Sequence, residues 1–120
     1  TLERTRLQAA LNFVSSELHK SFGPFFSGKE LDSEARQKAE AGVARRAAYV
    51  EQSLSDGRTF LLGETFSVAD AYAFVVLNWA GFVGVNLDAF PKTQAYVARI
   101  AVRPAAIKAM VAEGLMEQAA

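Results

Sequence analysis

The amino-acid sequence predicts an all-α protein, a bundle of five helices around a central buried helix. Apolar residues recur at helical spacing, the connections are short, and no segment alternates apolar and polar residues as a half-buried strand does. The 120 residues are 51% apolar and 22% charged, a composition typical of a globular domain. We therefore expect one helical domain over residues 1–120.

The first predicted helix covers residues 1–20. Its apolar side recurs at steps of four, three and four residues, and consists of Leu7, Leu11, Val14 and Leu18. Phe22-Gly23-Pro24 ends this helix, because the residue before a proline is pushed away from helical geometry. An amphipathic helix of this kind covers one side of a core.

The second predicted helix covers residues 32–56. Asp32 or Ser33 can cap the N–H groups of its first turn, and Gly57 suits the position just past its end. The buried side of this helix is predicted to hold Ala39, Val43, Val50 and Leu54. The short apolar run at 60–63 follows, and we expect a buried connection there because no partner strand is predicted.

The third predicted helix, residues 67–83, has the clearest start signal. Ser67 and Asp70 have the spacing of a capping box, in which each side chain accepts a hydrogen bond from the other residue's backbone N–H. Residues 72–83 are apolar nearly all round. A helix of that composition is expected to be buried on most sides, so we place it at the centre of the bundle.

Two shorter helices complete the prediction. Pro91 suits the first turn of a helix running to about Val102, because proline is already fixed near helical φ. Pro104 opens a fifth helix that is expected to end at Gly114.

Composition excludes several classes of function for this chain. Thirteen basic and thirteen acidic residues balance, which argues against nucleic-acid binding. Without cysteine, and with one histidine, there is no disulfide, thiolate nucleophile or histidine-based metal cluster, so no metal site is expected. The longest apolar run, 71–85, is shorter than the ~20 residues of a membrane span, so no membrane partner is expected. Because the chain begins at Thr1 rather than Met, we expect a piece of a longer protein.

One polar face is the leading candidate for a site. In a straight α-helix, at about 100° per residue, Asn12, Ser16 and His19 lie on one narrow side. An amide, a hydroxyl and an imidazole can hydrogen-bond a polar ligand or a partner's backbone, or they can simply face solvent. Glu17 lies on a third side of the same helix.

The predicted central helix carries further candidates. Asp70 is an acid in an apolar helix, but its capping-box spacing explains it, so we assign it a structural role. The aromatic side chains of this helix either line an apolar cavity or pack in the core, and they are Tyr72, Phe74, Trp79 and Phe82. Arg99 and Arg103, farther along, can pair with helix-end carbonyls or a carboxylate.

Several runs resemble a known family. The run FLLGETFSVADA at 60–71 resembles the block that opens the central helix in the C-terminal domain of glutathione transferases, and 90–104 resembles the family's last two core helices. The runs at 17–26 and 77–80 are similar to segments of the bacterial beta class. This resemblance covers nearly the whole chain and implies an all-α C-terminal domain, with a thioredoxin-like N-terminal domain absent from these residues.

The resemblance also implies roles for particular residues. His19 corresponds to a histidine facing the glutathione sulfur, Lys20 to a lysine near the reactive thiol, and Asn12 to an asparagine that reaches glutathione in part across a dimer. Trp79 corresponds to a tryptophan by the electrophile cavity or in its structural surroundings. The implied glutathione-binding residues are Asn12, Ser16, Glu17, Leu18, His19 and Lys20.

The implied activity is conjugation of glutathione to electrophiles or glutathione-dependent thiol exchange, with His19 catalytic. Glutathione is then a co-substrate beside a small hydrophobic electrophile, with no permanently bound cofactor, and the whole protein is a cytoplasmic bacterial homodimer. These 120 residues alone are expected to be inactive. The face that the absent N-terminal domain would cover is expected to be an exposed apolar patch that self-associates. The alternative is a non-catalytic interaction module of the same fold, and a helical ligand carrier is a third possibility.

Overall fold

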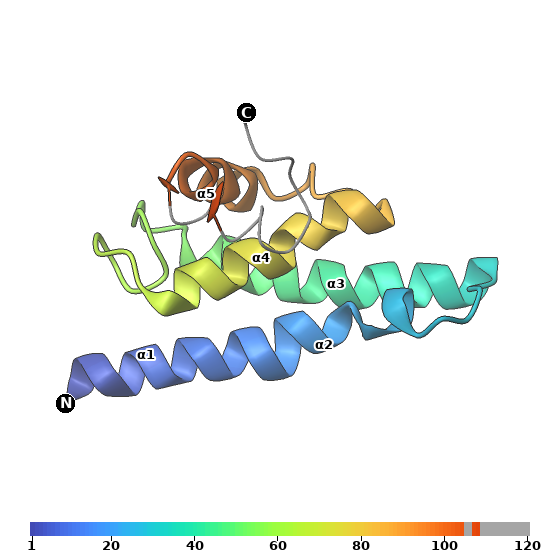
Figure 1. The fold of residues 1–120 in the computed structure, drawn as a ribbon, viewed down its shortest axis with the longest axis horizontal. Coiled ribbons are helices and arrows are strands. Elements are labelled where there is room, and N and C mark those ends of the chain that lie inside the picture. Colours follow the sequence, from blue (N-terminus) through green and yellow to red (C-terminus); the bar gives the residue numbers. More distant parts are fainter. Residues whose placement is uncertain (105–106, 109–120) are drawn as a thin grey trace.

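The computed structural model describes residues 1–104 and 107–108, which are all-α as predicted. Four long helical segments account for most of this part of the chain (Figure 1). The predicted fifth helix, 104–114, lies mostly outside the described residues, so four of the five expected helices are seen. Within the described ranges, the only extended pairing is a single bridge between Phe60 and Gly63, where a buried connection was expected.

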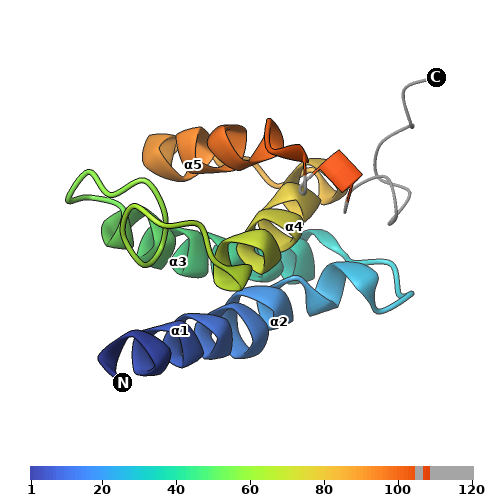
Figure 2. The same ribbon diagram turned by 60° about the vertical axis from the view of Figure 1, so that its left-hand side comes forward.

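The four segments lie in layers. Figures 1 and 2 show α4 between the N-terminal helical segment on one side and α5 on the other, with α3 crossing behind it. α4 contacts both outer segments, as expected of a central helix. The elements are α1 (Leu2–Phe13), a π-helical turn (Val14–Leu18), α2 (His19–Ser21), a 3₁₀ turn (Gly23–Phe26), α3 (Ser33–Ser53), α4 (Val68–Val83) and α5 (Pro91–Ala101).

The N-terminal segment is one continuous helix with a π turn in its middle. The Thr1 hydroxyl begins it by accepting from the Arg4 N–H at 3.2 Å. At the end of the π turn, the His19 N–H donates to the Val14 carbonyl, an i→i+5 bond in place of the usual i→i+4. Of the predicted apolar side, Val14 and Leu18 are fully buried, whereas Leu7 and Leu11 are half-buried. The helix is therefore α-helical at both ends but changes phase between them.

α3 begins as predicted, with the Asp32 carboxylate accepting from the Ala35 N–H at 2.8 Å. Its buried side holds Ala39, Val43, Ala47 and Val50. Side chains of α3 also cap the C-terminal end of α4 and the N-terminal end of α5. The Arg36 guanidinium donates to the Val83 carbonyl, at the last turn of α4, at 2.6 Å.

The start of α5 is capped from α3. Phe90 has no capping side chain, and the Glu51 carboxylate accepts instead from the N–H groups of Lys92 at 3.1 Å and Thr93 at 2.8 Å. The Thr93 hydroxyl donates to the same carboxylate at 3.0 Å. Desolvation raises the pKa of Glu51, but the backbone N–H donors of Thr93 and Lys92 outweigh it and leave the pKa below its ordinary value.

α4 has more buried residues than the other described helices, but they lie on one side of it. Ala73, Phe74 and Leu77 lie in the core with the side chains of the other segments. Val68 and Phe82, however, are 61% and 59% exposed. The expectation that this helix is buried on most sides is thus wrong for its two ends, because the described helices cover only part of its circumference.

Candidate functional site

A pocket of about 520 Å³ lies where α2 and the 3₁₀ turn pass the second half of α4. Trp79 and Phe82 are one helical turn apart on α4, so their side chains project toward the same side. The pocket is lined by His19, Gly23, Phe26, Trp79 and Phe82. An imidazole in an otherwise apolar and aromatic wall is the kind of lining that binds a small hydrophobic molecule and offers it one polar contact.

Trp79 lines this pocket and packs against other aromatic rings. Phe22 meets it edge to face at a centroid distance of 5.9 Å, and Phe26 does so at 5.4 Å. Phe22 is fully buried, whereas Phe26 is exposed. The Trp79 ring therefore connects the core to an open apolar surface, which fits the sequence expectation that it lines a cavity.

His19 is fixed by two side chains of α4. Its Nδ1 atom lies 2.5 Å from the Tyr72 hydroxyl, and its ring meets the Trp79 ring edge to face at 5.1 Å. Tyr72 and Trp79 are two helical turns apart on α4, which brings both to the same side of the helix. The sequence placed Tyr72 among the cavity or core residues but did not reveal its bond to His19; the seven-residue spacing from Trp79 was the available signal.

The π turn separates the residues that a straight helix would have grouped. In a turn with i→i+5 bonds, each residue rotates through a smaller angle about the helix axis than in an α-helix. His19 is therefore rotated about this axis relative to Asn12 and Ser16. The Ser16 hydroxyl donates to the Asn12 carbonyl of its own helix at 2.5 Å. His19 faces α4, whereas Ser16 lines a different hollow. The predicted single polar face is therefore divided between two flanks.

The second flank faces α3. Ser16, Glu17 and Lys20 line a groove of about 550 Å³ together with residues of α3 that include Arg45 and Arg46. The Glu17 carboxylate is paired with the Arg46 guanidinium at 3.1 Å. Three of the predicted glutathione-binding residues thus lie together, apart from the aromatic pocket.

Two predicted site residues differ from these in position. Leu18 is fully buried in the core, so the described structure exposes none of it to a ligand. Asn12 is exposed, on the outer surface of the N-terminal helix. Neither lines the aromatic pocket, whose wall contains a single member of the predicted glutathione set, His19.

Asp70 is completely buried, and both of its carboxylate oxygens accept hydrogen bonds. Oδ2 accepts from the Ser67 N–H at 2.8 Å and from the Ser67 hydroxyl at 3.0 Å, in the capping box that begins α4. Oδ1 accepts from the Leu61 N–H at 2.9 Å and from the Tyr96 hydroxyl at 2.7 Å. Asp70 therefore links α4 to the preceding connection and to α5, and has no spare capacity directed at a cavity.

Burial and the charge of Asp70 both raise the pKa of Tyr96 far above its ordinary value. Tyr96 is thus a permanent O–H donor to the carboxylate. A buried acid with a full set of donors stabilises the fold, and we assign it no role in chemistry.

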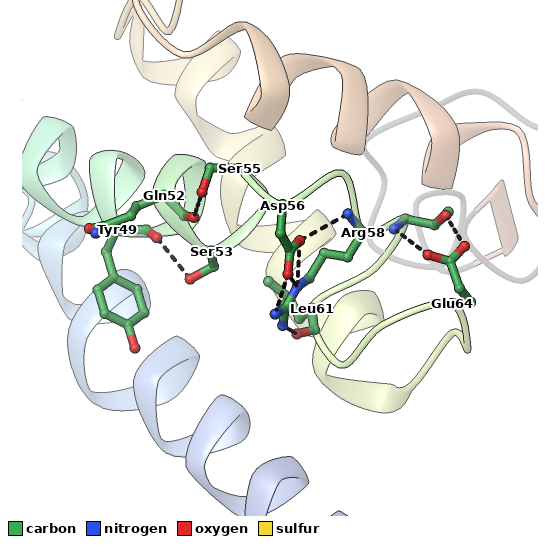
Figure 3. Close-up of polar contacts among 9 residues, drawn as sticks. Tyr49, Gln52, Ser53, Ser55, Asp56, Arg58, Leu61 and Glu64 are labelled. Atoms are coloured by element: carbon green, nitrogen blue, oxygen red, sulfur yellow. Dashed lines mark hydrogen bonds and ion pairs between the residues drawn. The ribbon is translucent and has the colours of Figure 1, made fainter.

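The loop between α3 and α4 is held by its own polar contacts (Figure 3). The Arg58 guanidinium donates to the Asp56 carboxylate at 2.8 Å and to the Leu61 carbonyl at 2.9 Å. The side-chain and backbone N–H donors of Arg58 lower the pKa of Asp56 to about 2. The loop borders a hollow of about 500 Å³ beside α1 and α3, but its charged groups are already bonded to one another.

The fold and the pocket together define a helical domain with a single imidazole in an aromatic binding wall. Residues 13–104 match the family model "Glutathione S-transferase, C-terminal domain". The chain therefore belongs to the glutathione S-transferase C-terminal domain family, as its resemblance predicted.

Individual relatives agree with this assignment. Glutathione S-transferase GstA of Escherichia coli O157:H7 is 37% identical over 105 residues, covering 88% of this chain and 51% of that protein. A glutathione transferase structure from Methylococcus capsulatus is 43% identical with a TM-score of 0.86, covering 97% of this chain and 57% of the other. A bacterial beta class glutathione S-transferase from Sphingomonas chungbukensis is 41% identical, with a TM-score of 0.85 and the same coverage. The chain thus spans slightly more than half the length of these relatives.

No helix among the described residues is both long enough and apolar enough to span a membrane.

Proposed function

We propose that this chain is the C-terminal domain of a bacterial glutathione transferase. The enzyme joins glutathione to a small hydrophobic electrophile or carries out glutathione-dependent thiol exchange. The observation that carries the proposal is the placement of the single histidine in the wall of an aromatic pocket of about 520 Å³. A sphingomonad glutathione S-transferase complexed with glutathione is 40% identical to this chain, which supports glutathione as the co-substrate.

The chemical task of the site is to favour the thiolate. A thiol has an ordinary pKa of about 8.5 and is mostly protonated at neutral pH, whereas the thiolate is the nucleophile. A hydrogen bond from the His19 imidazole to the sulfur stabilises the thiolate. The thiolate sulfur then bonds to the electrophilic carbon, which the rings of Trp79, Phe26 and Phe82 hold against it. With an aryl halide, the carbon–halogen bond breaks and halide leaves to solvent.

The two flanks of the N-terminal helix suggest how the glutathione-binding residues are shared. His19 faces the aromatic pocket beside α4, while Ser16, Glu17 and Lys20 line the groove beside α3. We assign the pocket flank to the sulfur bound by this subunit. The groove flank, with Asn12, serves the glutathione of a second copy. Such sharing requires a homodimer.

The upstream part of the protein completes the proposal. This chain covers little more than half of its relatives, so we place the rest of the glutathione site in an N-terminal thioredoxin-like domain. Because the relatives are bacterial glutathione transferases, we place the whole protein in the bacterial cytoplasm. Without the N-terminal domain, residues 1–120 should have no transferase activity.

The first experiment tests His19 in the full-length protein. A His19→Ala change should lower kcat with an aryl halide by roughly ten- to a hundredfold, the usual contribution of a positioned acid or base. A Gln8→Ala change, at an exposed position of the same helix, is the matched control and should leave kcat unaltered. Equal turnover of His19→Ala and the wild type would contradict a catalytic role for His19.

Binding to immobilised glutathione separates the enzyme from the non-catalytic module. Full-length protein should be retained and eluted by free glutathione, and Asn12→Ala or Lys20→Ala should raise the KM for glutathione about three- to tenfold, since each removes one polar contact. Failure of the wild type to bind would reject the proposal in favour of an interaction module. Light scattering of the full-length protein should give twice the monomer mass; a monomer at all concentrations would contradict the shared site.

A further inference from the structure

We propose that Tyr72 is a positioning residue that fixes the tautomer of His19, so that the imidazole presents its Nε2–H to the aromatic pocket. This inference rests on the proposed function, in which His19 donates to a sulfur anion. It concerns a residue outside the set that the sequence indicated as catalytic or glutathione-binding. The contact that carries it joins two segments 53 residues apart in the sequence.

The geometry of the contact restricts the imidazole. Nδ1 lies 2.5 Å from the Tyr72 hydroxyl, and the ring is in edge contact with Trp79 at 5.1 Å and with Tyr72 at 5.8 Å. These contacts fix both the position of one ring nitrogen and the plane of the ring. Nε2, on the other side of the ring from Nδ1, has no hydrogen-bond partner among the described residues, and His19 lines the pocket.

The direction of the hydrogen bond follows from counting protons. A neutral imidazole has one donor and one acceptor nitrogen, and a tyrosine hydroxyl has one proton and an ordinary pKa of about 10. Tyr72 is half-buried, and its hydroxyl has no other acceptor in the described part of the chain. Donation from the hydroxyl to Nδ1 gives the half-buried tyrosine proton a partner and leaves the imidazole proton on the exposed ring, where water or a ligand can accept it. The reverse would leave the half-buried tyrosine proton without a protein partner. With Nδ1 accepting, the imidazole proton is on Nε2.

This arrangement suits the reaction proposed above. A thiolate near the pocket needs a donor, and only the Nε2–H tautomer offers one there while Nδ1 is occupied. Without Tyr72, the imidazole exchanges between two tautomers and can rotate, so part of the population presents an acceptor to the sulfur. Tyr72 does not touch the substrate in this scheme and acts only through His19.

Nitrogen NMR tests the tautomer directly. ¹⁵N shifts of the His19 ring are recorded on the full-length protein at mildly alkaline pH. The spectrum of a His19→Gln variant identifies the His19 signals by their absence. The wild type should show a protonated Nε2 and an unprotonated Nδ1. Tyr72→Phe should move the two shifts toward each other. A proton on Nδ1 in the wild type, or identical shifts in both proteins, would overturn the proposal.

Tyr49 offers a matched control. Its ring stacks on Phe13 at a centroid distance of 4.4 Å, and its hydroxyl has no hydrogen-bond partner among the described residues. Tyr49→Phe therefore removes a hydroxyl while keeping ring packing, as Tyr72→Phe does. The His19 shifts should be the same in Tyr49→Phe and the wild type. A change as large as that of Tyr72→Phe would mean that the shifts report general loosening, and the proposal would be rejected.

Kinetics then test whether the tautomer matters. Tyr72→Phe should lower kcat with an aryl halide roughly tenfold, less than His19→Ala, with the KM for glutathione changed less than about twofold. In a His19→Gln background, Tyr72→Phe should have no further effect on kcat. An equal loss in both backgrounds would show that Tyr72 acts independently of His19. If His19→Gln itself left kcat unaltered, the proposed function would fail, while the NMR result would still decide the tautomer.

Discussion

A polar side chain of α4 and another packed against this helix are in opposite situations. Asp70, in the first turn, is completely buried and accepts from Ser67, Leu61 and Tyr96. His19, against the second half of the helix, is exposed and uses one ring nitrogen for Tyr72 while the other remains available at a pocket. Residue type alone favours neither as the functional group. The number of partners and the direction of the remaining hydrogen-bonding capacity decide which one stabilises the fold and which one can act on a ligand.

The largest expected effect is at Asp70. Asp70→Ala removes the acceptor for four donors and leaves several of them buried without partners, so the free energy of unfolding should fall by about 3–5 kcal/mol. Because about 1 kcal/mol shifts the Tm of a domain of this size by roughly 4–8 °C, the Tm should fall by more than about 10 °C. Calorimetry or thermal circular dichroism measures this. A Tm within about 2 °C of the wild type would contradict the role of Asp70 in linking α4 to the preceding connection and to α5.

Tyr96 and Tyr72 differ in the same way as the groups to which they donate. Tyr96→Phe removes the donor to a buried carboxylate and should cost about 1–2 kcal/mol of the free energy of unfolding. Tyr72→Phe removes a donor to an exposed imidazole that can turn to water, so its cost should be below about 0.5 kcal/mol. Urea denaturation of both variants measures the difference. The reverse order would assign the structural role to the His19 pair and the comparison would fail.

Glu51 tests a cap that comes from another helix. Glu51→Gln should cost about 1 kcal/mol at pH 7, as the loss of a charged N-terminal cap does. Because the folded pKa of Glu51 is below its ordinary 4.5, the stability it adds is present above that pH and is lost as the pH falls through the folded pKa. The difference between the two proteins in urea denaturation should therefore shrink below about pH 4.5. A constant difference down to pH 2 would contradict the role of the charge.

The smallest effect is expected at Asp56. Its pKa is lowered to about 2 by Arg58, but the pair is at the surface, where solvent screens it. Asp56→Asn should leave the unfolding midpoint in urea unchanged at neutral pH. A shift as large as that of Glu51→Gln would show that the loop between α3 and α4 contributes to stability more than its exposure suggests.

Much of the fold follows from local sequence patterns. Asp32 and Ser67 cap helices at the predicted positions, and Pro91 is in the first turn of α5. Each of these signals involves residues only three or four positions apart, so it does not depend on how the helices pack. The apolar spacing placed Val14 and Leu18 in the core for the same reason. His19 and Trp79 were candidates from the sequence and its resemblance, and both line the aromatic pocket.

Other features depend on contacts between distant segments. The π turn that separates His19 from Ser16 has no signature in the apolar spacing, because plain α-helical geometry is the local default. The bond from Tyr72 to His19 and the cap from Glu51 to Thr93 join residues 53 and 42 positions apart. Neither partner determines such a contact alone, since it forms only when helix packing has set the distance and direction between them. Local sequence patterns therefore specify the helices, their caps and the family, whereas packing between distant helices sets which polar groups are satisfied and which one remains available to a ligand.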